Sequence, residues 1–177
     1  MRTDEFELLL TTVAEAGPIR NLWPLYVHDL SAYDGRAPNR HGVITTDAEA
    51  TIWSGPGDWW SKPQILFPYL VRMGGKAAGF NLIASGPHVP TKGVDFVVHE
   101  FFLARAFRGS DVARLAAQRG IEKHRGAWEV VTYPSAARPI AFWRKTLPTC
   151  AQGEVIETEE DHPWGRKVVF RFDNRTP

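Results

Sequence analysis

One segment of the sequence, residues 97–113, combines residue types that can bind a phosphate and move a proton. An apolar run containing His99 and Glu100 leads into the basic turn Arg108-Gly109-Ser110, and a helix-forming stretch follows. Backbone N–H groups at the start of a helix lack partners, and the helix dipole adds positive potential there. The sequence therefore predicts that main-chain N–H groups at this turn can hold a pyrophosphate.

The same segment offers groups for acid–base chemistry. Glu100 is the candidate base, because a carboxylate on a buried strand can take a proton directly or through water; the alternative is a structural glutamate paired with an arginine such as Arg72 or Arg138. Imidazole changes protonation near neutrality, but strand alternation places His99 on the opposite sheet face, so it ranks lower. Tyr133 is a candidate acid, or a strand-end tyrosine whose hydroxyl is simply satisfied.

The rest of the chain predicts the elements that position this segment. Strands are expected from alternating or continuous apolar runs at residues 6–13, 65–73, 77–85, 95–103, 128–132, 149–157 and 166–172. Helices are expected from apolar spacings of three and four, with turn signals at their ends, at residues 19–33, 108–124 and 136–146. Residues 36–64 are expected to form loops with at most a short helix, and residues 157–165 a polar turn. The order indicates a mixed α/β (α+β) fold, with helices on a largely antiparallel sheet interrupted by one parallel crossover.

The strand, turn and helix at residues 97–113 resemble those of the GNAT superfamily of N-acyltransferases. Members have a strand ending in a run like Phe101-Phe102-Leu103, then a loop of form Arg/Gln-x-x-Gly-x-Gly/Ala that opens a helix. Residues 108–113 match the first and last positions of that loop, and residues 22–30 and 139–145 resemble the family's first and fourth helices. The resemblance implies one acyltransferase domain over residues 1–177, with about seven strands and about four helices.

The resemblance also implies acetyl-CoA as co-substrate and direct transfer of its acetyl group to a small-molecule or peptide amine in a ternary complex. Backbone N–H groups of Phe102 or Leu103 would polarise the thioester where the central strand separates from the next one. A domain of the same fold that binds or senses acyl-CoA without turnover is the alternative. The residues implied in cofactor binding are Phe101, Phe102, Leu103, Arg108, Gly109, Ser110, Asp111, Val112, Ala113, Phe142 and Trp143.

Three positions depart from the family pattern. Asp111 replaces the central glycine of the loop, and its charge either opposes the phosphates or points outward and meets the helix dipole favourably. Phe142-Trp143 supplies no acid where many members have a tyrosine, and Trp143 is either core packing or a contact for the pantetheine arm. Residues 135–137, Ser-Ala-Ala, stand where an asparagine often holds that arm.

Two groups of residues fall in regions that receive the acceptor in relatives. Trp53, Trp59 and Trp60 either line an aromatic acceptor pocket or belong to the core. The acidic residues of the predicted closing turn either attract a cationic amine or are ordinary solvated charges; they are Glu157, Glu159, Glu160 and Asp161.

Composition narrows the function classes further. The 177 residues carry 21 Lys and Arg against 20 Asp and Glu, so no strong field favours nucleic acid or an anionic membrane. The polar start and short apolar runs predict a cytoplasmic protein. Cys150 is the single cysteine, which excludes an intrachain disulfide and is interpreted as apolar filler. The histidines show no metal-ligand spacing, so no metal is predicted. A homodimer is compatible with the sequence, which does not define the oligomeric state.

Overall fold

The computed structural model describes residues 5–52 and 54–175 and contains a seven-stranded mixed sheet in the order β1-β2-β3-β4-β5-β7-β6. All neighbouring strands are antiparallel except β4 and β5, which are parallel. This confirms the predicted fold class. The strands are β1 (Phe6–Leu10), β2 (Leu66–Met73), β3 (Lys76–Ser85), β4 (Phe96–Leu103), β5 (Ala127–Thr132), β6 (Ile156–His162) and β7 (Gly165–Asp173).

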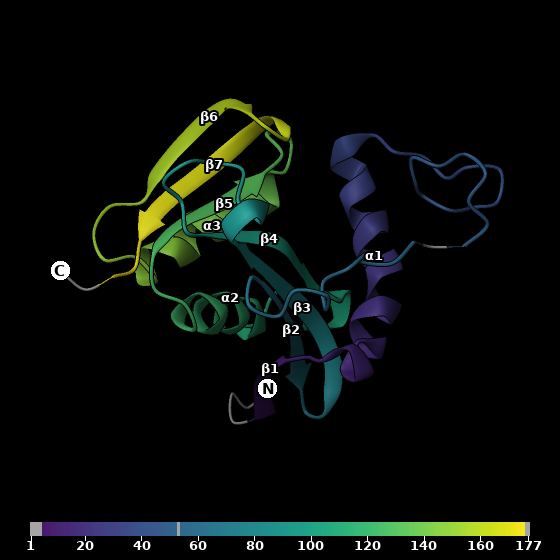
Figure 1. The fold of residues 1–177 in the computed structure, drawn as a ribbon, viewed down its shortest axis with the longest axis horizontal. Helices are drawn as coiled ribbons and strands as arrows, with labels where there is room; N and C mark the ends of the chain where they lie inside the picture. The colour runs from purple at the N-terminus through teal and green to yellow at the C-terminus, as the bar shows by residue number, and fades with distance from the viewer. Residues whose placement is uncertain (1–4, 53, 176–177) are drawn as a thin grey trace.

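One long helix, α1 (Gly17–Asp34), covers one face of the sheet (Figure 1). Pro18 suits its first turn, and Gly35 ends it in the left-handed conformation with φ of 73°. The apolar stripe predicted from the sequence buries Ile19 and Tyr26 against Phe80 and other residues of β2, β3 and β4. The stripe therefore fixes α1 directly over the central strands.

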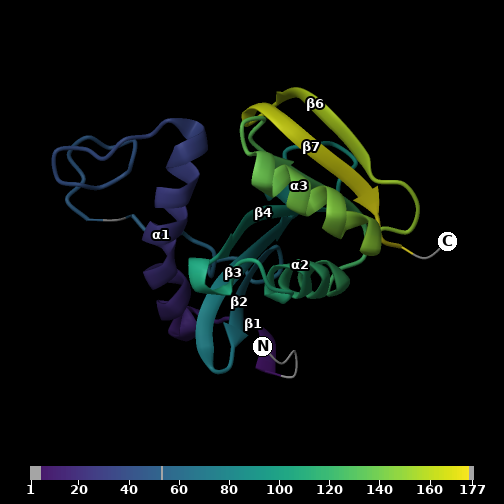
Figure 2. The ribbon, with the colours of Figure 1, turned by 180° about the vertical axis from the view of Figure 1, so that it is seen from behind.

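Two shorter helices, α2 (Val112–Glu122) and α3 (Ala137–Thr146), lie together on the opposite face (Figure 2). Because side chains alternate along a strand, β3 contributes apolar residues to both faces of the sheet. Leu82 packs on the α1 side, and its neighbour Ile83 packs with Ile121 of α2. Within the described residues the structure has three α-helices, whereas about four were expected. Residues 35–65 explain the difference, since their described part forms loops, turns and one isolated bridge between Pro38 and Ile44.

The predicted position of the penultimate strand was wrong. Residues 147–149 form a 3-10 turn and a loop follows, whereas β6 lies in the acidic stretch interpreted as a turn. The stretch is an edge strand whose charges are paired: Arg144 with Glu157, Arg166 with Glu159 and Asp161, and Arg171 with Glu160. Edge strands in proteins often carry such charges, which hide the apolar alternation that identifies a strand.

Helix α2 begins at Val112 rather than at the predicted residue 108. Residues 105–107 form a 3-10 turn, and Gly109 has φ of 74°, which interrupts the helical backbone. None of the helices in the described residues combines the length and apolar character needed to cross a bilayer.

Candidate active site

The central strands β4 and β5 separate halfway along their length. Their parallel pairing covers Phe96 to Val98 of β4 and ends where Val98 meets Val130. Beyond that point β5 pairs only with β7, while the last five residues of β4, 99–103, pair only with β3. The predicted separation of the two strands is therefore present, and it leaves one edge of β4 without a partner strand.

Strand geometry decides which N–H groups face that open edge. The N–H of Ala104 donates to Ala78 O in the direction of β3 (2.9 Å). Because successive N–H groups alternate in direction, the N–H of Phe102 also points to β3, and that of Leu103 points to the open edge. Of the two donors named from the sequence, Leu103 is the one that the backbone aims into the gap.

A β-bulge at His99 lies at the point of separation. Leu82 of β3 is opposite Glu100 and Ile83 is opposite Val98, so His99 is one extra residue on β4. The bulge places two successive side chains on the α1 face, with 3.2 Å between His99 Nδ1 and Glu100 Oε1. The prediction that His99 and Glu100 point to opposite faces was therefore wrong, because alternation fails at a bulge.

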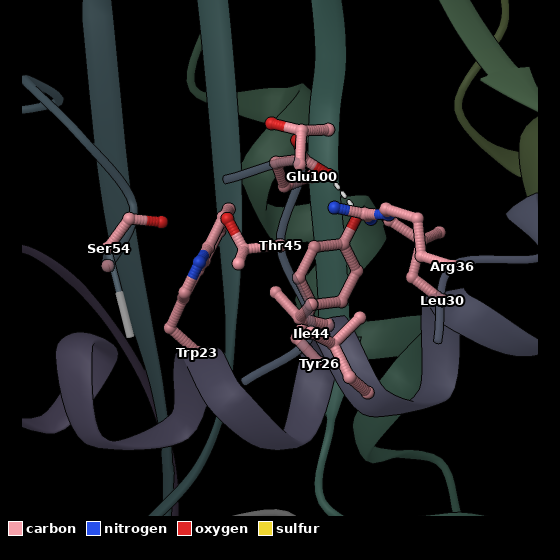
Figure 3. Close-up of a pocket in the computed structure, with 11 residues that line it drawn as sticks. Trp23, Tyr26, Leu30, Arg36, Ile44, Thr45, Ser54 and Glu100 are labelled. Atoms are coloured by element: carbon pink, nitrogen blue, oxygen red, sulfur yellow. Dashed lines mark hydrogen bonds between the residues drawn. The ribbon is translucent and has the colours of Figure 1, made fainter. Parts of the chain in front are cut away.

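Glu100 has a second partner from α1, since the Tyr26 hydroxyl donates a hydrogen bond to its Oε2 (Figure 3). Burial, followed by the charge of Glu100, raises the pKa of Tyr26 well above its usual range, which keeps the hydroxyl a donor. The alternative partners expected from the sequence, Arg72 and Arg138, make no ion pair with Glu100 among the described residues.

The turn before α2 leaves a row of main-chain donors without partners. Among the hydrogen bonds of the described residues, none has the N–H of residues 109–113 as its donor, and the first N–H of α2 to donate is that of Leu115. Gly109, Ser110 and Asp111 are exposed, whereas Val112 is buried and Ala113 half-buried. The turn therefore offers unpaired main-chain donors within the described residues, and there is open space where a Cβ at Gly109 would lie.

Two charged residues of this turn are already paired with protein groups. Arg108 donates from Nε to Leu103 O (2.7 Å) and from Nη2 to Asp29 Oδ2 of α1, and its guanidinium lies 5.4 Å from the centre of the Phe102 ring. Asp111 accepts from Arg114, one turn later on α2, at 3.1 Å. Arg108 thus ties the turn to α1, and the charge of Asp111 is partly neutralised.

An aromatic cluster lines the α3 side of β4. The ring of Phe101 is stacked on that of Phe142 with 5.6 Å between centroids, and Trp143 meets Phe101 edge-on at 5.2 Å. Trp143 is buried, whereas Phe101 and Phe142 are half-buried. Trp143 is therefore core packing, and the half-buried pair remains accessible beside the open edge of β4.

Tyr133 comes directly after β5, across the gap from Glu100. It is close enough for the charge of Glu100 to act on its hydroxyl. Burial raises the pKa of Tyr133, and the charges of Asp34 and Glu100 raise it further. Lys167 Nζ lies 3.6 Å from the centre of the Tyr133 ring, and burial lowers the pKa of this lysine. The hydroxyl of Tyr133 thus stays protonated through neutral pH.

A cavity of about 220 Å³ opens on the α1 face beside Glu100. Its apolar lining includes Trp23 and Leu30 of α1, and Arg36 and Thr45 add polar groups from the loop that follows (Figure 3). Arg36 is itself paired with Asp34 at 2.6 Å. The cavity lies on the α1 face, where Glu100 of β4 joins its lining, whereas α2 packs on the opposite face of the sheet.

Comparison with known proteins gives matches only at the level of structure. No protein-family model and no curated protein matches the sequence. An acetyltransferase from Thermus thermophilus superposes with a TM-score of 0.64 over 98% of this chain and 99% of its own, at 13% identity. The chain has the GNAT fold.

Two further solved structures with the GNAT fold were determined with a ligand. PaiA N-acetyltransferase from Thermoplasma acidophilum, in complex with coenzyme A, has a TM-score of 0.62 and 6% identity, and covers 95% of this chain and 98% of its own. YncA from Salmonella typhimurium, with its cofactor acetyl-CoA, has a TM-score of 0.60 and 11% identity, with 98% and 96% covered. At these identities the likeness establishes the fold.

The tryptophans named from the sequence have separate positions in this GNAT fold. Trp59 is buried and meets His99 edge-on, with 5.3 Å between ring centroids. Trp60 donates to Thr11 Oγ1 at 3.0 Å and is packed away from the site. Trp53 lies outside the described residues. Trp164, at the β6–β7 turn, is an aromatic neighbour that the sequence analysis missed; its centroid is 4.9 Å from that of His99.

Tyr26 and Arg36 were also missed from the sequence. Tyr26 belongs to the apolar stripe of α1, and nothing in that pattern separates a core tyrosine from one that reaches a carboxylate on β4. Arg36 lies in the loop-rich stretch whose course no periodicity predicts. Only the bulge and the placement of α1 bring these groups together with His99 and Glu100.

Proposed function

We propose that this protein is an acetyl-CoA-dependent N-acetyltransferase, acting as one domain over residues 1–177 in the cytoplasm. The observation that carries the proposal is the parting of β4 and β5 after Val98 and Val130, beside a turn whose N–H groups at residues 109–113 donate no hydrogen bond within the described part of the chain. A diphosphate bound at the turn would lead the pantetheine arm past Phe101 and Phe142 into the gap. YncA, which has the same fold, is described with acetyl-CoA, and this supports the assignment.

In the gap, the N–H of Leu103 would bind the thioester oxygen and stabilise the negative charge that develops on it. The acceptor amine would enter from the cavity on the α1 face and meet the carbonyl carbon beside Glu100. Attack forms the C–N bond and breaks the C–S bond, and Tyr133 would donate a proton to the departing sulfur. The sum is an amide, free CoA and one proton moved from nitrogen to sulfur.

Binding and turnover are tested separately. Calorimetry should give micromolar affinity for acetyl-CoA, and S-acetylpantetheine, which lacks the diphosphate, should bind about 100-fold more weakly because the N–H groups of the turn have nothing to hold. Turnover is measured as CoA release with a panel of primary amines: an alkylamine, a polyamine, a free amino acid, an aminosugar and a peptide α-amine. Equal affinity for the two thioesters, or none for either, would refute the site.

A second function is favoured by two features: Asp111 places a carboxylate at the start of α2, and α3 has Phe142 and Trp143 instead of an acid. This combination suits a domain that senses acyl-CoA without turnover. Tight binding of acetyl-CoA with no CoA release for any amine in the panel would support the sensing domain over the enzyme.

A further inference from the structure

The hydrogen bonds of Glu100 occupy both oxygens of its carboxylate. Oε2 accepts from the Tyr26 hydroxyl, and Oε1 lies 3.2 Å from His99 Nδ1. The Glu100 side chain is 20% exposed, and that of His99 is 32% exposed. The His99 side chain is therefore the more exposed of the two, and its Nε2 makes no hydrogen bond among the described residues.

The carboxylate also determines where the hydrogen of the imidazole lies. An ionised carboxylate can only accept hydrogen bonds, so the contact with Glu100 requires the hydrogen of neutral His99 to be on Nδ1. Nε2 then carries the lone pair. A neutral imidazole held in one tautomer by a carboxylate is the arrangement that a general base needs.

Aromatic residues hold the His99 ring in place on two sides. Trp59 meets it at 5.3 Å and Trp164 at 4.9 Å between centroids. The β6–β7 turn that carries Trp164 is itself anchored. The backbone N–H of Trp164 donates to His162 Nδ1 (3.1 Å), and His162 Nε2 contacts Oε1 of buried Glu129 (3.0 Å). The ring of His99 therefore has little freedom to turn away from the gap.

We infer that His99 is the general base of the proposed acetyl transfer, and that Glu100, supported by Tyr26, is a positioning residue. The inference rests on the proposed function. His99 is the first residue of β4 beyond its last contact with β5, and its neighbour Glu100 lines the cavity on the α1 face, so Nε2 would meet an amine that enters beside Glu100. As the neutral amine attacks the carbonyl carbon, Nε2 takes the proton that nitrogen loses; the C–S bond breaks, and sulfur gains a proton from Tyr133. His99 then releases its proton to solvent and Tyr133 takes one up, which restores both groups.

Three variants separate this assignment from the rival in which Glu100 takes the proton. His99→Asn keeps an amide near the Nδ1 position and removes Nε2, and it should lower kcat/KM about 100-fold. The acetyl-CoA Kd should stay within about twofold of the wild type. Glu100→Gln should lower kcat about 10-fold and keep the acidic limb of the pH–rate profile, which His99→Asn should abolish. His41→Asn, in an exposed loop, is the matched control and should change neither.

Glu100 is the charged group in contact with His99; Tyr26, Arg36 and Tyr133 lie around Glu100, and the buried pair His162 and Glu129 lies behind Trp164. Among these, only His99 should move the acidic limb. His99→Ala should regain part of its activity on addition of free imidazole, which a purely structural role would not allow.

Tautomer measurement tests the geometry without turnover. Two-bond proton–nitrogen correlation spectra of the labelled protein should show His99 with its hydrogen on Nδ1, and Glu100→Ala should shift it toward the mixture of a free imidazole. An Nε2–H tautomer overturns the inference. The inference is also overturned if the activity of His99→Asn stays within about threefold of the wild type, or if the acidic limb is lost only in Glu100→Gln. Absence of turnover by the wild type would instead overturn the proposed function, and the catalytic role with it.

Discussion

Asp111 places a negative charge in the α2 turn proposed to hold a diphosphate, and its contact with Arg114 makes a quantitative prediction possible. A unit charge about 5 Å from a phosphate, at an effective dielectric constant between 20 and 80, costs about 1 to 3 kcal/mol. Arg114 lies 3.1 Å from the carboxylate, and the Asp111 side chain is 66% exposed. The paired cation and the solvent cancel most of that repulsion. Asp111→Asn should therefore tighten acetyl-CoA binding by no more than about threefold.

Arg114→Gln should have the larger effect, because it removes a cation and leaves Asp111 uncompensated. We expect acetyl-CoA to bind about threefold to tenfold more weakly in low salt, and the double variant to return close to the wild-type Kd. Titration calorimetry at two salt concentrations measures both changes, which should shrink in high salt. Arg119→Gln removes a similar pair, with Glu122 at 3.1 Å in the last turn of α2, and is the control. Tenfold tightening by Asp111→Asn would show that Arg114 does not screen the charge.

Three further predictions concern the catalytic acid, the central strands and pH. Tyr133→Phe should lower kcat about 10-fold with little change in acetyl-CoA Kd, since a phenyl ring keeps the contact with Lys167; an unchanged kcat excludes Tyr133 as the acid. Gly79→Ala should cost about 2 to 3 kcal/mol in urea unfolding, because its Cβ would collide with the carbonyl oxygen of Phe102, whereas Gly17→Ala, with open space, should be nearly neutral. Burial lowers the pKa of His124 from 6.5 to about 4, so the unfolded chain binds the extra proton, and stability should fall by about 1 to 2 kcal/mol between pH 7 and 5. His124→Gln should flatten that dependence; equal urea midpoints for the wild type at both pH values would contradict it.

Regular periodicity predicted most of the fold. The helix α1 and the strands β2 to β5 lie within a few residues of their expected bounds, because their apolar residues recur at the spacing of one buried face. The position of β6 was not predicted, because its residues Glu157 and Glu159 are held by ion pairs with arginines rather than by burial. Sequence patterns of apolar residues detect burial, and β6 is at the sheet edge, where little burial is required.

Of the candidate site, local sequence patterns indicate only the main-chain turn. The turn at residues 108–113 was found because a glycine and a helix start have a local sequence pattern. The contact of Tyr26 with Glu100 joins residues 74 positions apart, and the contact of Arg108 with Asp29 joins residues 79 apart. Such contacts depend on how α1 is placed over the sheet, which no local pattern reports.

The single extra residue at position 99 determines both halves of the proposed chemistry. Without the bulge, Leu82 would be opposite His99, and every later residue of β4 would shift by one position against β3. Glu100 would then point to the α2 face, away from Tyr26, and the N–H of Phe102 rather than Leu103 would face the open edge. With the bulge, His99 and Glu100 are both on the α1 face while the N–H of Leu103 points to the open edge. One backbone irregularity therefore sets the direction both of the groups proposed to accept or guide a proton and of the N–H proposed to bind the thioester oxygen.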